Sequence, residues 1–109
     1  MNHEKLLGLL SLSRKAGKLK VGFEPALESS MMGEAALILT ASDLSEKSLH
    51  RLQTKLAALD GPPRVVPIAY TMEELSRITR KLTGICTVCD TGFARGIETL
   101  MTDDEEDTI

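Results

Sequence analysis

The chain has few aromatic residues, no tryptophan and no hydrophobic run long enough to cross a bilayer. Aromatic residues make up only 3% of its 109 residues. Proteins that grip single-stranded nucleic acid stack its bases on aromatic rings, so the composition disfavours that mode of binding. The leucine-rich segment 6–12 is interrupted by Gly8 and Ser11, whereas crossing a bilayer takes about 20 apolar residues. We therefore expect neither a membrane partner nor a signal peptide.

Cysteine is scarce as well. The two cysteines form one C-x-x-C motif, Cys86-Thr87-Val88-Cys89, inside an apolar segment typical of a strand. A redox pair places its first cysteine at a helix N-terminus. A structural zinc site needs four ligands, and only the distant His3 and His50 remain as further candidates. We interpret both cysteines as small buried strand residues and expect no metal site. Because no disulfide framework is present, a cytoplasmic location is expected.

The signatures of nucleotide-dependent enzymes are also missing. Neither G-x-G-x-x-G nor G-x-x-x-x-G-K-[ST] can be written anywhere in the chain. His50 has no evident serine or cysteine nucleophile paired with it. We therefore predict that the protein is not an enzyme, that it uses no cofactor, and that it has no evident small-molecule substrate.

Charge is unevenly distributed along the chain. The net charge is -3, but five of the sixteen acidic residues lie within the last seven positions. Residues 1–102 therefore carry thirteen basic and eleven acidic residues. The acidic end has too little apolar surface to order itself by burial. We predict a single domain over residues 1–101, followed by a disordered acidic tail over 102–109.

What the chain does contain is a clear transition from strand to helix within residues 33–48. The apolar run Leu37–Thr40 is long enough for a buried strand, and polar residues follow it directly. Asp43 with Glu46 fits a capping box for the next helix, and Ser45 is an equally good N-cap. A buried strand that feeds a helix indicates an α/β fold. Unpaired helix N–H groups at such a turn are a place where an anion can bind.

Helical and strand patterns alternate along the whole chain. Helices are expected at residues 3–15, from Gly22 to Gly33, at about 46–59, at 72–82 and from Gly92 to Met101. Strands are expected at residues 18–21, 37–40, 65–66 and 85–89. In the fourth helix, Thr71 with Glu74 forms a capping box, and Leu82 is expected to point inward. Pro67 predicts that the third strand ends there or lies at an edge of the sheet. The alternation predicts a four-stranded sheet with helices on both faces.

Basic residues gather in three groups. One lies near the end of the fourth predicted helix and consists of Arg77, Arg80 and Lys81. In another, Lys47, Arg51 and Lys55 follow one another at a spacing of four, which is typical of a solvated helix face. The last group adjoins the helix start at Gly22, and positive charge beside free N–H groups is an arrangement that binds phosphate. This group consists of Arg14, Lys15, Lys18 and Lys20.

Taken together, these residues resemble a known family. The matching blocks lie in order and at family spacing over about residues 5–101; they are Leu6-Leu7-Gly8-Leu9, Arg14-Lys15-Ala16-Gly17-Lys18-Leu19, Gly22, Gly33–Ser45 and Asp90-Thr91-Gly92-Phe93-Ala94. The chain resembles the kink-turn RNA-binding superfamily of ribosomal proteins (ribosomal protein L-seven-Ae and relatives). Within that superfamily the resemblance is to the small bacterial YlxQ-type members.

The resemblance implies a fold and a partner. The fold is a three-layer α/β/α sandwich with a four-stranded mixed sheet. The partner is structured RNA, often a sharply bent helix–internal loop–helix with sheared G·A pairs, and ribosomal RNA is among the candidates. The implied function is therefore that of a non-enzymatic RNA-binding protein in a ribonucleoprotein, with a role in translation.

The family motif at the second helix is only partly present. It reads Gly-x-Asn-Glu-x-x-Lys, and Gly22 matches its first position. Glu24, Pro25 and Glu28 occupy the positions of the Asn, the Glu and the Lys. The second RNA-facing element of the family is the loop entering the last strand, here Lys81–Ile85, with an apolar residue available to cover an extruded base. The predicted RNA-binding residues are Arg14, Lys15, Lys18, Lys20, Gly22, Phe23, Glu24, Lys81, Leu82, Thr83, Gly84 and Ile85.

Two other functions are compatible with the residues. Glu24, Pro25 and Glu28 favour a protein-interaction module that kept the fold and lost RNA recognition. An accessory domain akin to the substrate-recognition part of ribose methyltransferases is a third hypothesis, although the chain contains no methyltransferase domain of its own.

Overall fold

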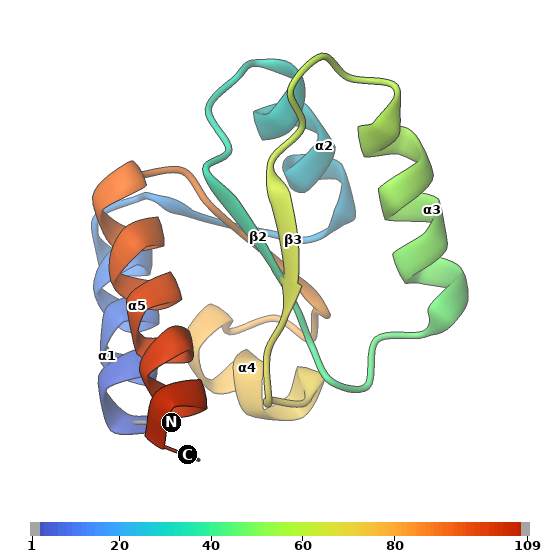
Figure 1. Cartoon of the computed structure of the whole chain (residues 1–109). Helices are drawn as coiled ribbons and strands as arrows, with labels where there is room; N and C mark the ends of the chain where they lie inside the picture. Colours follow the sequence, from blue (N-terminus) through green and yellow to red (C-terminus); the bar gives the residue numbers. More distant parts are fainter. Residues whose placement is uncertain (1–2, 108–109) are drawn as a thin grey trace.

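The computed structural model describes residues 3–107 (Figure 1). In chain order its elements are α1 (His3–Lys15), β1 (Leu19–Val21), α2 (Phe23–Met31), β2 (Leu37–Thr40), α3 (Glu46–Ala57), β3 (Arg64–Pro67), α4 (Met72–Thr79), β4 (Ile85–Val88) and α5 (Thr91–Asp107). The alternation of helix and strand predicted from the sequence is confirmed. None of the described helices is both long and apolar enough to cross a membrane.

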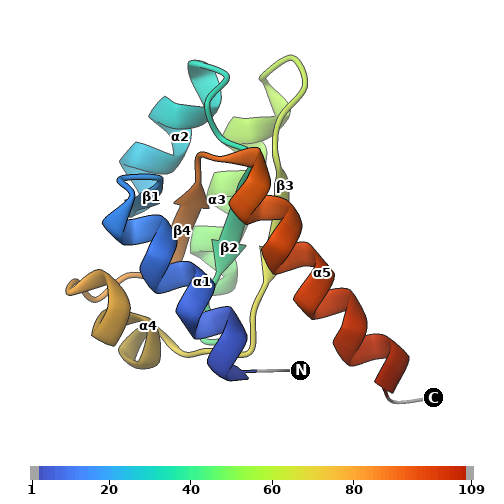
Figure 2. The ribbon, with the colours of Figure 1, turned by 90° about the vertical axis from the view of Figure 1, so that its left-hand side faces the viewer.

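The four strands form one mixed sheet in the order β1-β4-β2-β3. Strands β2 and β3 are parallel, whereas β4 runs antiparallel to both of its neighbours, β1 and β2. Figure 2 shows α1 and α5 in front of the sheet and α3 behind it. The predicted α/β sandwich with a four-stranded mixed sheet is therefore confirmed.

The two central strands are buried along their whole length, and the edge strand β3 is not. Pro67 is the last residue of β3, at the outer edge of the sheet. A proline cannot donate a ladder hydrogen bond, so an edge strand is where it is tolerated. Both parts of the prediction for this residue are confirmed.

Side chains alternate between two cores, because successive strand residues point to opposite faces. Leu37 and Leu39 of β2 pack in the larger core together with buried residues of α1, α4 and α5. Ile38 packs in the smaller core with residues of α2 and α3 and with Ile85 of β4. The sheet is thus covered on both faces, and the two layers of helices are separated by it.

The helix caps confirm two predictions and correct a third. Thr71 and Glu74 form the predicted capping box of α4. Ser45 is the N-cap of α3, where its hydroxyl accepts a hydrogen bond from the N–H of Ser48 at 3.1 Å. The alternative box of Asp43 with Glu46 is wrong. Asp43 instead accepts a hydrogen bond from the N–H of Met72 at 2.9 Å, so it ties the β2–α3 turn to the start of α4.

Helix α4 ends earlier than its apolar pattern predicts. It stops at Thr79 because Arg80 adopts a left-handed conformation with φ of 63°. The chain then turns away from the core, and Leu82 is 71% exposed. The expectation that Leu82 points inward as part of the helix is therefore wrong.

The last helix extends beyond the expected boundary at Met101. Its backbone is helical as far as Asp107, and residues 108–109 lie outside the described residues. Five acidic residues occupy positions 103–107, at the end of a helix where the dipole disfavours negative charge. The disordered tail over 102–109 stays a prediction.

One buried polar group leads to a prediction about stability. The Thr87 side chain of β4 is fully buried, and within the described part of the chain its hydroxyl has no hydrogen-bond partner. Burying an unpaired hydroxyl costs about 1–3 kcal/mol, and valine has nearly the same shape. We expect Thr87→Val to raise the free energy of unfolding by about 1 kcal/mol in urea denaturation, and Thr87→Ala to lower it. A destabilised valine variant would show that the hydroxyl is satisfied.

Candidate nucleic-acid interface

Strand pairing brings two of the predicted RNA-facing segments together. The N–H of Gly22 donates to the carbonyl of Ile85 at 2.9 Å, at the point where β4 begins. This hydrogen bond places the start of α2 beside the Lys81–Ile85 loop. Segments some sixty residues apart in the chain are therefore neighbours at this end of the sheet.

The same pairing separates part of the predicted basic group from this surface. The carbonyl of Lys18 accepts a hydrogen bond from the N–H of Cys89 at 2.7 Å, just past the other end of β4. Four residues along a strand span roughly 13 Å, which is therefore the distance from Lys18 to Gly22. Arg14 and Lys15, at the end of α1, precede Lys18 across the turn at Gly17. These cations lie at the far end of β1 from the loop.

The remaining cation of that group, Lys20, has acidic neighbours. It lines a hollow of about 330 Å³ with Lys18 and Glu34, and a second hollow of about 210 Å³ with Glu28 and Glu34. Two carboxylates therefore lower the positive potential around Lys20. Glu28 occupies the position where the family motif has a lysine, so this side of α2 is less attractive to phosphate than in the motif.

The start of α2 is open to an anion. Gly22 is its N-cap with φ of 109°, a conformation that favours glycine, and no side chain caps the helix. Pro25 has no N–H, and the N–H of Gly22 already donates to Ile85. Within residues 3–107, the N–H groups of Phe23 and Glu24 in this first turn have no hydrogen-bond acceptor. Two amide donors at the positive end of a helix dipole suit a phosphate oxygen.

Two threonines hold the loop between α4 and β4. The hydroxyl of Thr79 donates to the carbonyl of Lys81 at 2.8 Å. The hydroxyl of Thr83 donates to the carbonyl of Ile85 at 3.2 Å, and it accepts from the N–H of Ile85 at 3.3 Å. These local bonds shape the loop while the side chain of Leu82 projects into solvent.

A glycine lets the loop approach the β2–α3 turn closely. A methyl group built on Gly84 would lie 2.6 Å from Cδ1 of Leu44, which is too close unless the leucine moves. Gly84 and Leu44 are thus packed together at the floor of the site. A side chain at position 84 would therefore force Leu44 to move.

These elements enclose a hollow of about 250 Å³. Its wall combines apolar side chains with one guanidinium, and it is lined by Phe23, Leu44, Ser48, Arg51, Met72, Leu82, Thr83, Gly84 and Ile85. The guanidinium carbon of Arg51 lies 4.3 Å from the centre of the Phe23 ring, a cation–π contact. We refer to this hollow as the Phe23–Arg51 pocket. The pocket thus combines the flat, charged guanidinium of Arg51 with apolar side chains.

Phe23 and four residues of the Lys81–Ile85 loop, all predicted to face RNA, line this pocket together with α3 residues that were not predicted. Arg51 was interpreted as part of a solvated helix face; it is exposed, and it also stacks on Phe23. Ser48 and Met72 were not proposed for the site. The missing information is the placement of α3 against α2, which a single-helix pattern does not contain. Glu24, which was predicted, is exposed beside the pocket on the first turn of α2.

The C-x-x-C motif is not part of this site. Both cysteines are free; Cys86 is 1% exposed and Cys89 is partly exposed. Burial raises the pKa of the Cys86 thiol to about 12. Among residues 3–107, no three histidine, cysteine or acidic side chains lie close enough together to hold a metal ion. Cys86 is the buried strand residue that the sequence predicts. The same interpretation is wrong for Cys89, which lies one position past β4 and is partly exposed.

Known proteins resemble this chain in sequence and in structure. No family model matches the chain. The RNA-binding protein YlxQ of Enterococcus faecium is 24% identical over 100 residues, which cover 92% of this chain and 94% of that protein. The 15.5 kD RNA-binding protein of Giardia lamblia has a TM-score of 0.66 at 23% identity, covering 94% of this chain and 92% of that one. A Bacillus halodurans protein of unknown function has a TM-score of 0.77 at 25% identity, covering 90% of this chain and 97% of that one.

These comparisons support the family that the sequence motifs predicted. The match to YlxQ extends over nearly the whole of both chains. The Giardia protein has a similar fold. The resemblance to the ribosomal protein L-seven-Ae family, and within it to YlxQ-type proteins, is confirmed.

The different burial of the two cysteines predicts different reactivity. At pH 8 a thiol-specific reagent should modify Cys89 in the folded protein, and Cys86 only after denaturation, because a pKa of about 12 leaves almost no thiolate. Above pH 9.0, the ordinary thiol pKa, Cys86 loses its proton in the unfolded chain but keeps it in the folded protein. The free energy of unfolding should therefore fall as the pH rises from 9.0 toward about 12. Stopped-flow labelling of Cys86→Ala and Cys89→Ala assigns the two rates. Equal rates in the two variants would contradict the burial of Cys86.

Proposed function

We propose that this chain is a non-enzymatic protein that binds structured RNA, and that the Phe23–Arg51 pocket receives a base extruded from an internal loop. The observation that carries the proposal is the juxtaposition of three features: a guanidinium stacked on an aromatic ring, the uncapped start of α2 and the exposed Leu82. The names of YlxQ and of the Giardia protein support RNA as the partner.

The pocket provides the contacts that an unpaired base needs. Single-stranded loops and bulges are recognised by stacking on aromatic rings or guanidinium planes, together with hydrogen bonds to base edges. Arg51, already stacked on Phe23, is held in place without RNA and loses little freedom on binding. Leu82 lies where it can cover the opposite side of the base. An extruded base would then exchange water for apolar and stacking contacts on both faces.

The backbone around the pocket provides the phosphate contacts. The N–H groups of Phe23 and Glu24 face a ligand at the helix start, and Gly22 allows the sugar–phosphate chain to approach. Lys81 and Arg51 supply positive charge at the rim. Phosphate contacts of this kind set affinity and register, whereas the choice of sequence comes from base contacts.

We further propose that the target is a bent, kink-turn-like element, with ribosomal RNA as the first candidate. Support comes from the two RNA-facing segments, which meet at one end of the sheet as a bend between two helical stems requires. Glu24 occupies the position of the asparagine in the family motif. While ionised, its carboxylate can only accept hydrogen bonds. We therefore expect it to read the N–H groups of a guanine edge. Lys18 and Lys20 would contact phosphates of one stem, away from the pocket.

One observation favours a second function. Glu28 and Glu34 flank Lys20, so the β1 side of α2 carries compensating charges rather than a uniform positive surface. A protein-interaction module would tolerate such a surface. Affinity capture from lysate with and without ribonuclease separates the two functions, since a protein partner that survives the nuclease favours the second.

The pocket predicts a difference between two substitutions on one helix. Arg51→Glu should weaken binding to an internal-loop RNA hairpin by at least about tenfold, because base stacking contributes about 1–3 kcal/mol. Lys55→Glu is the matched control, since it makes the same change of charge one turn further along α3, outside the pocket lining. Fluorescence anisotropy measures both dissociation constants. Equal losses would mean that net charge alone governs binding.

The β1 lysines predict a change in salt dependence. For a duplex, the logarithm of the binding constant falls with the logarithm of salt at about -0.9 per neutralised phosphate. If Lys18 and Lys20 each contact a phosphate, Lys18→Glu with Lys20→Glu should abolish measurable binding at physiological salt, and at low salt it should reduce the slope by about 1.8. Lys55→Glu, outside the pocket lining, again serves as the control cation. Unchanged binding in the double variant would remove β1 from the interface while leaving the pocket to its own test.

A further inference from the structure

Three basic residues, Arg77, Arg80 and Lys81, lie where α4 ends, and we refer to them as the α4 cations. All three are exposed, and within the described part of the chain none of them forms an ion pair. The acidic residues of this helix, Glu73 and Glu74, are in its first turn. Lys81 belongs to the predicted RNA-facing loop, whereas neither arginine lines the Phe23–Arg51 pocket. The α4 cations therefore form a positive surface that the pocket does not use.

The backbone of Arg80 is the observation that points to a ligand. Its φ is 63°, and among residues 3–107 no other residue except glycine has a positive φ. Directly after a helix, the common residue in this conformation is glycine, which adopts it without a steric cost. Attraction of a cation to the end of the helix does not require an arginine here, because Arg77 already lies in the last turn. A strained backbone that a smaller residue would relieve is typical of functional positions.

Local hydrogen bonds hold the turn that carries the α4 cations. The N–H of Arg80 donates to the carbonyl of Ser76 at 2.8 Å. The hydroxyl of the buried Thr79 donates to the carbonyl of Lys81 at 2.8 Å and accepts from the N–H of Lys81 at 3.4 Å. The backbone that carries the cations is thus fixed before a ligand binds, so binding orders only their side chains.

The α4 cations and the β1 lysines lie on opposite sides of the Phe23–Arg51 pocket. Ile85, the first residue of β4, lines the pocket, and Lys18 is bonded just past the other end of that strand. The α4 cations precede β4, and the chain from α4 enters the strand at its start (Figure 2). A ligand that fills the pocket can therefore extend toward β1 in one direction and toward the end of α4 in the other.

We propose that the α4 cations bind the sugar–phosphate backbone of an RNA stem, the one that leaves the pocket on the side away from β1. This rests on the proposed function, because the base in the pocket fixes where the stem begins. Guanidinium groups bind phosphate oxygens through paired hydrogen bonds, and such contacts set affinity and register without reading sequence. The bent RNA is then held at three places: one stem on the β1 lysines, the base in the pocket and the other stem at the end of α4.

Arg80→Gly separates a binding role from a structural one, because the two readouts should move in opposite directions. The substitution relieves the left-handed backbone, so the urea midpoint of unfolding should rise. It also removes a phosphate contact, so RNA affinity should fall at least about threefold at physiological salt, and the salt slope should fall by about 0.9. A variant that binds RNA as tightly as wild type, with the same salt slope, overturns the proposal.

Arg77→Gln tests the second guanidinium without changing the backbone. Glutamine and arginine have similar helix propensities, so the fold should be kept while RNA affinity falls to a similar extent. Arg95→Gln is the matched control, since Arg95 is an exposed arginine of α5 on the other helical layer. Fluorescence anisotropy over a salt series measures both variants. Equal losses in the two variants would mean that net charge alone governs binding and would contradict the assignment to α4.

Shortened RNAs test which stem each group of cations holds. The probes are an RNA with two stems joined by an internal loop, and two derivatives in which one stem or the other is cut back to the loop. Removing one stem should abolish the effect of Arg80→Gly and leave that of the double variant Lys18→Glu with Lys20→Glu. Removing the other stem should do the reverse. If both effects vanish with the same stem, the two groups of cations hold one stem and the proposal is wrong.

The two proposals can fail separately. A wild-type chain that does not bind the two-stem RNA contradicts the proposed function. A wild-type chain that binds it, and that loses affinity in Arg51→Glu but not in Arg77→Gln or Arg80→Gly, contradicts only the assignment of the α4 cations.

Discussion

The position of β4 between β1 and β2 is the constraint on which the rest of the molecule depends. Its side chains contribute to both cores, since Cys86 and Val88 lie on one face and Ile85 on the other. The carbonyl of Ile85 also accepts the N–H of Gly22, so the first residue of β4 fixes the start of α2. The loop before β4 is therefore held next to that helix. The pocket follows from strand order, not from any one segment.

Much of the fold could be predicted from the sequence because its signals are local. The bounds of α1 and β2 match the apolar patterns, and Thr71 with Glu74 forms its capping box within four residues. Asp43 was assigned to the wrong helix because its partner, the N–H of Met72, lies 29 positions along the chain. The same distinction applies to the candidate site. The loop residues and Phe23 could be proposed from local sequence patterns, whereas the place of Arg51 in the pocket depends on how α3 packs against α2.

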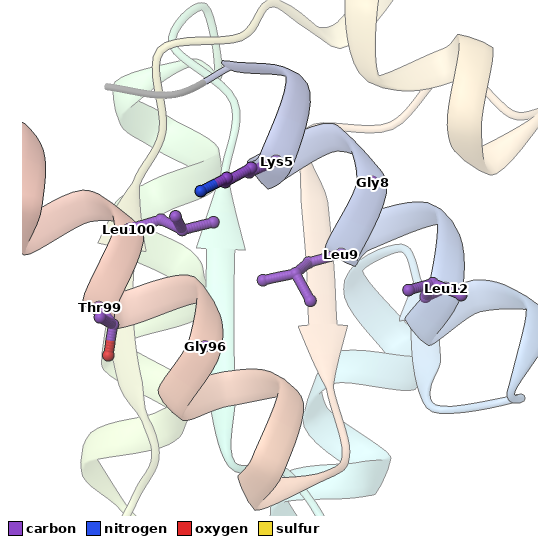
Figure 3. A pocket seen from close by; sticks show the side chains of 7 residues that line it. All are labelled: Lys5, Gly8, Leu9, Leu12, Gly96, Thr99 and Leu100. Atoms are coloured by element: carbon purple, nitrogen blue, oxygen red, sulfur yellow. The ribbon is translucent and has the colours of Figure 1, made fainter.

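The sheet separates two layers of helices, and the exposed surfaces of these layers differ in chemistry. The α2–α3 layer and the loop before β4 present a stacked cation, free amide groups and an exposed leucine. The α1–α5 layer presents a mostly apolar groove of about 480 Å³, with Lys5 as its one charged lining residue (Figure 3). Because the sheet lies between them, substitutions on one surface have little direct contact with the other. A negative net charge is compatible with RNA binding here, since five of the sixteen acidic residues lie at positions 103–107 and the rest of the chain has more basic than acidic residues.

Both edges of the sheet are protected from pairing with another chain. At one edge, β1 has only three residues. At the other, Pro67 has no N–H to offer, and the exposed Arg64 forms an ion pair with Glu98 of α5 at 3.3 Å. Short strands, proline and charge at an edge are the features that block strand addition. Partly unfolded molecules should consequently form fibrils slowly, and native molecules should not pair through their sheet edges even in a crowded cell.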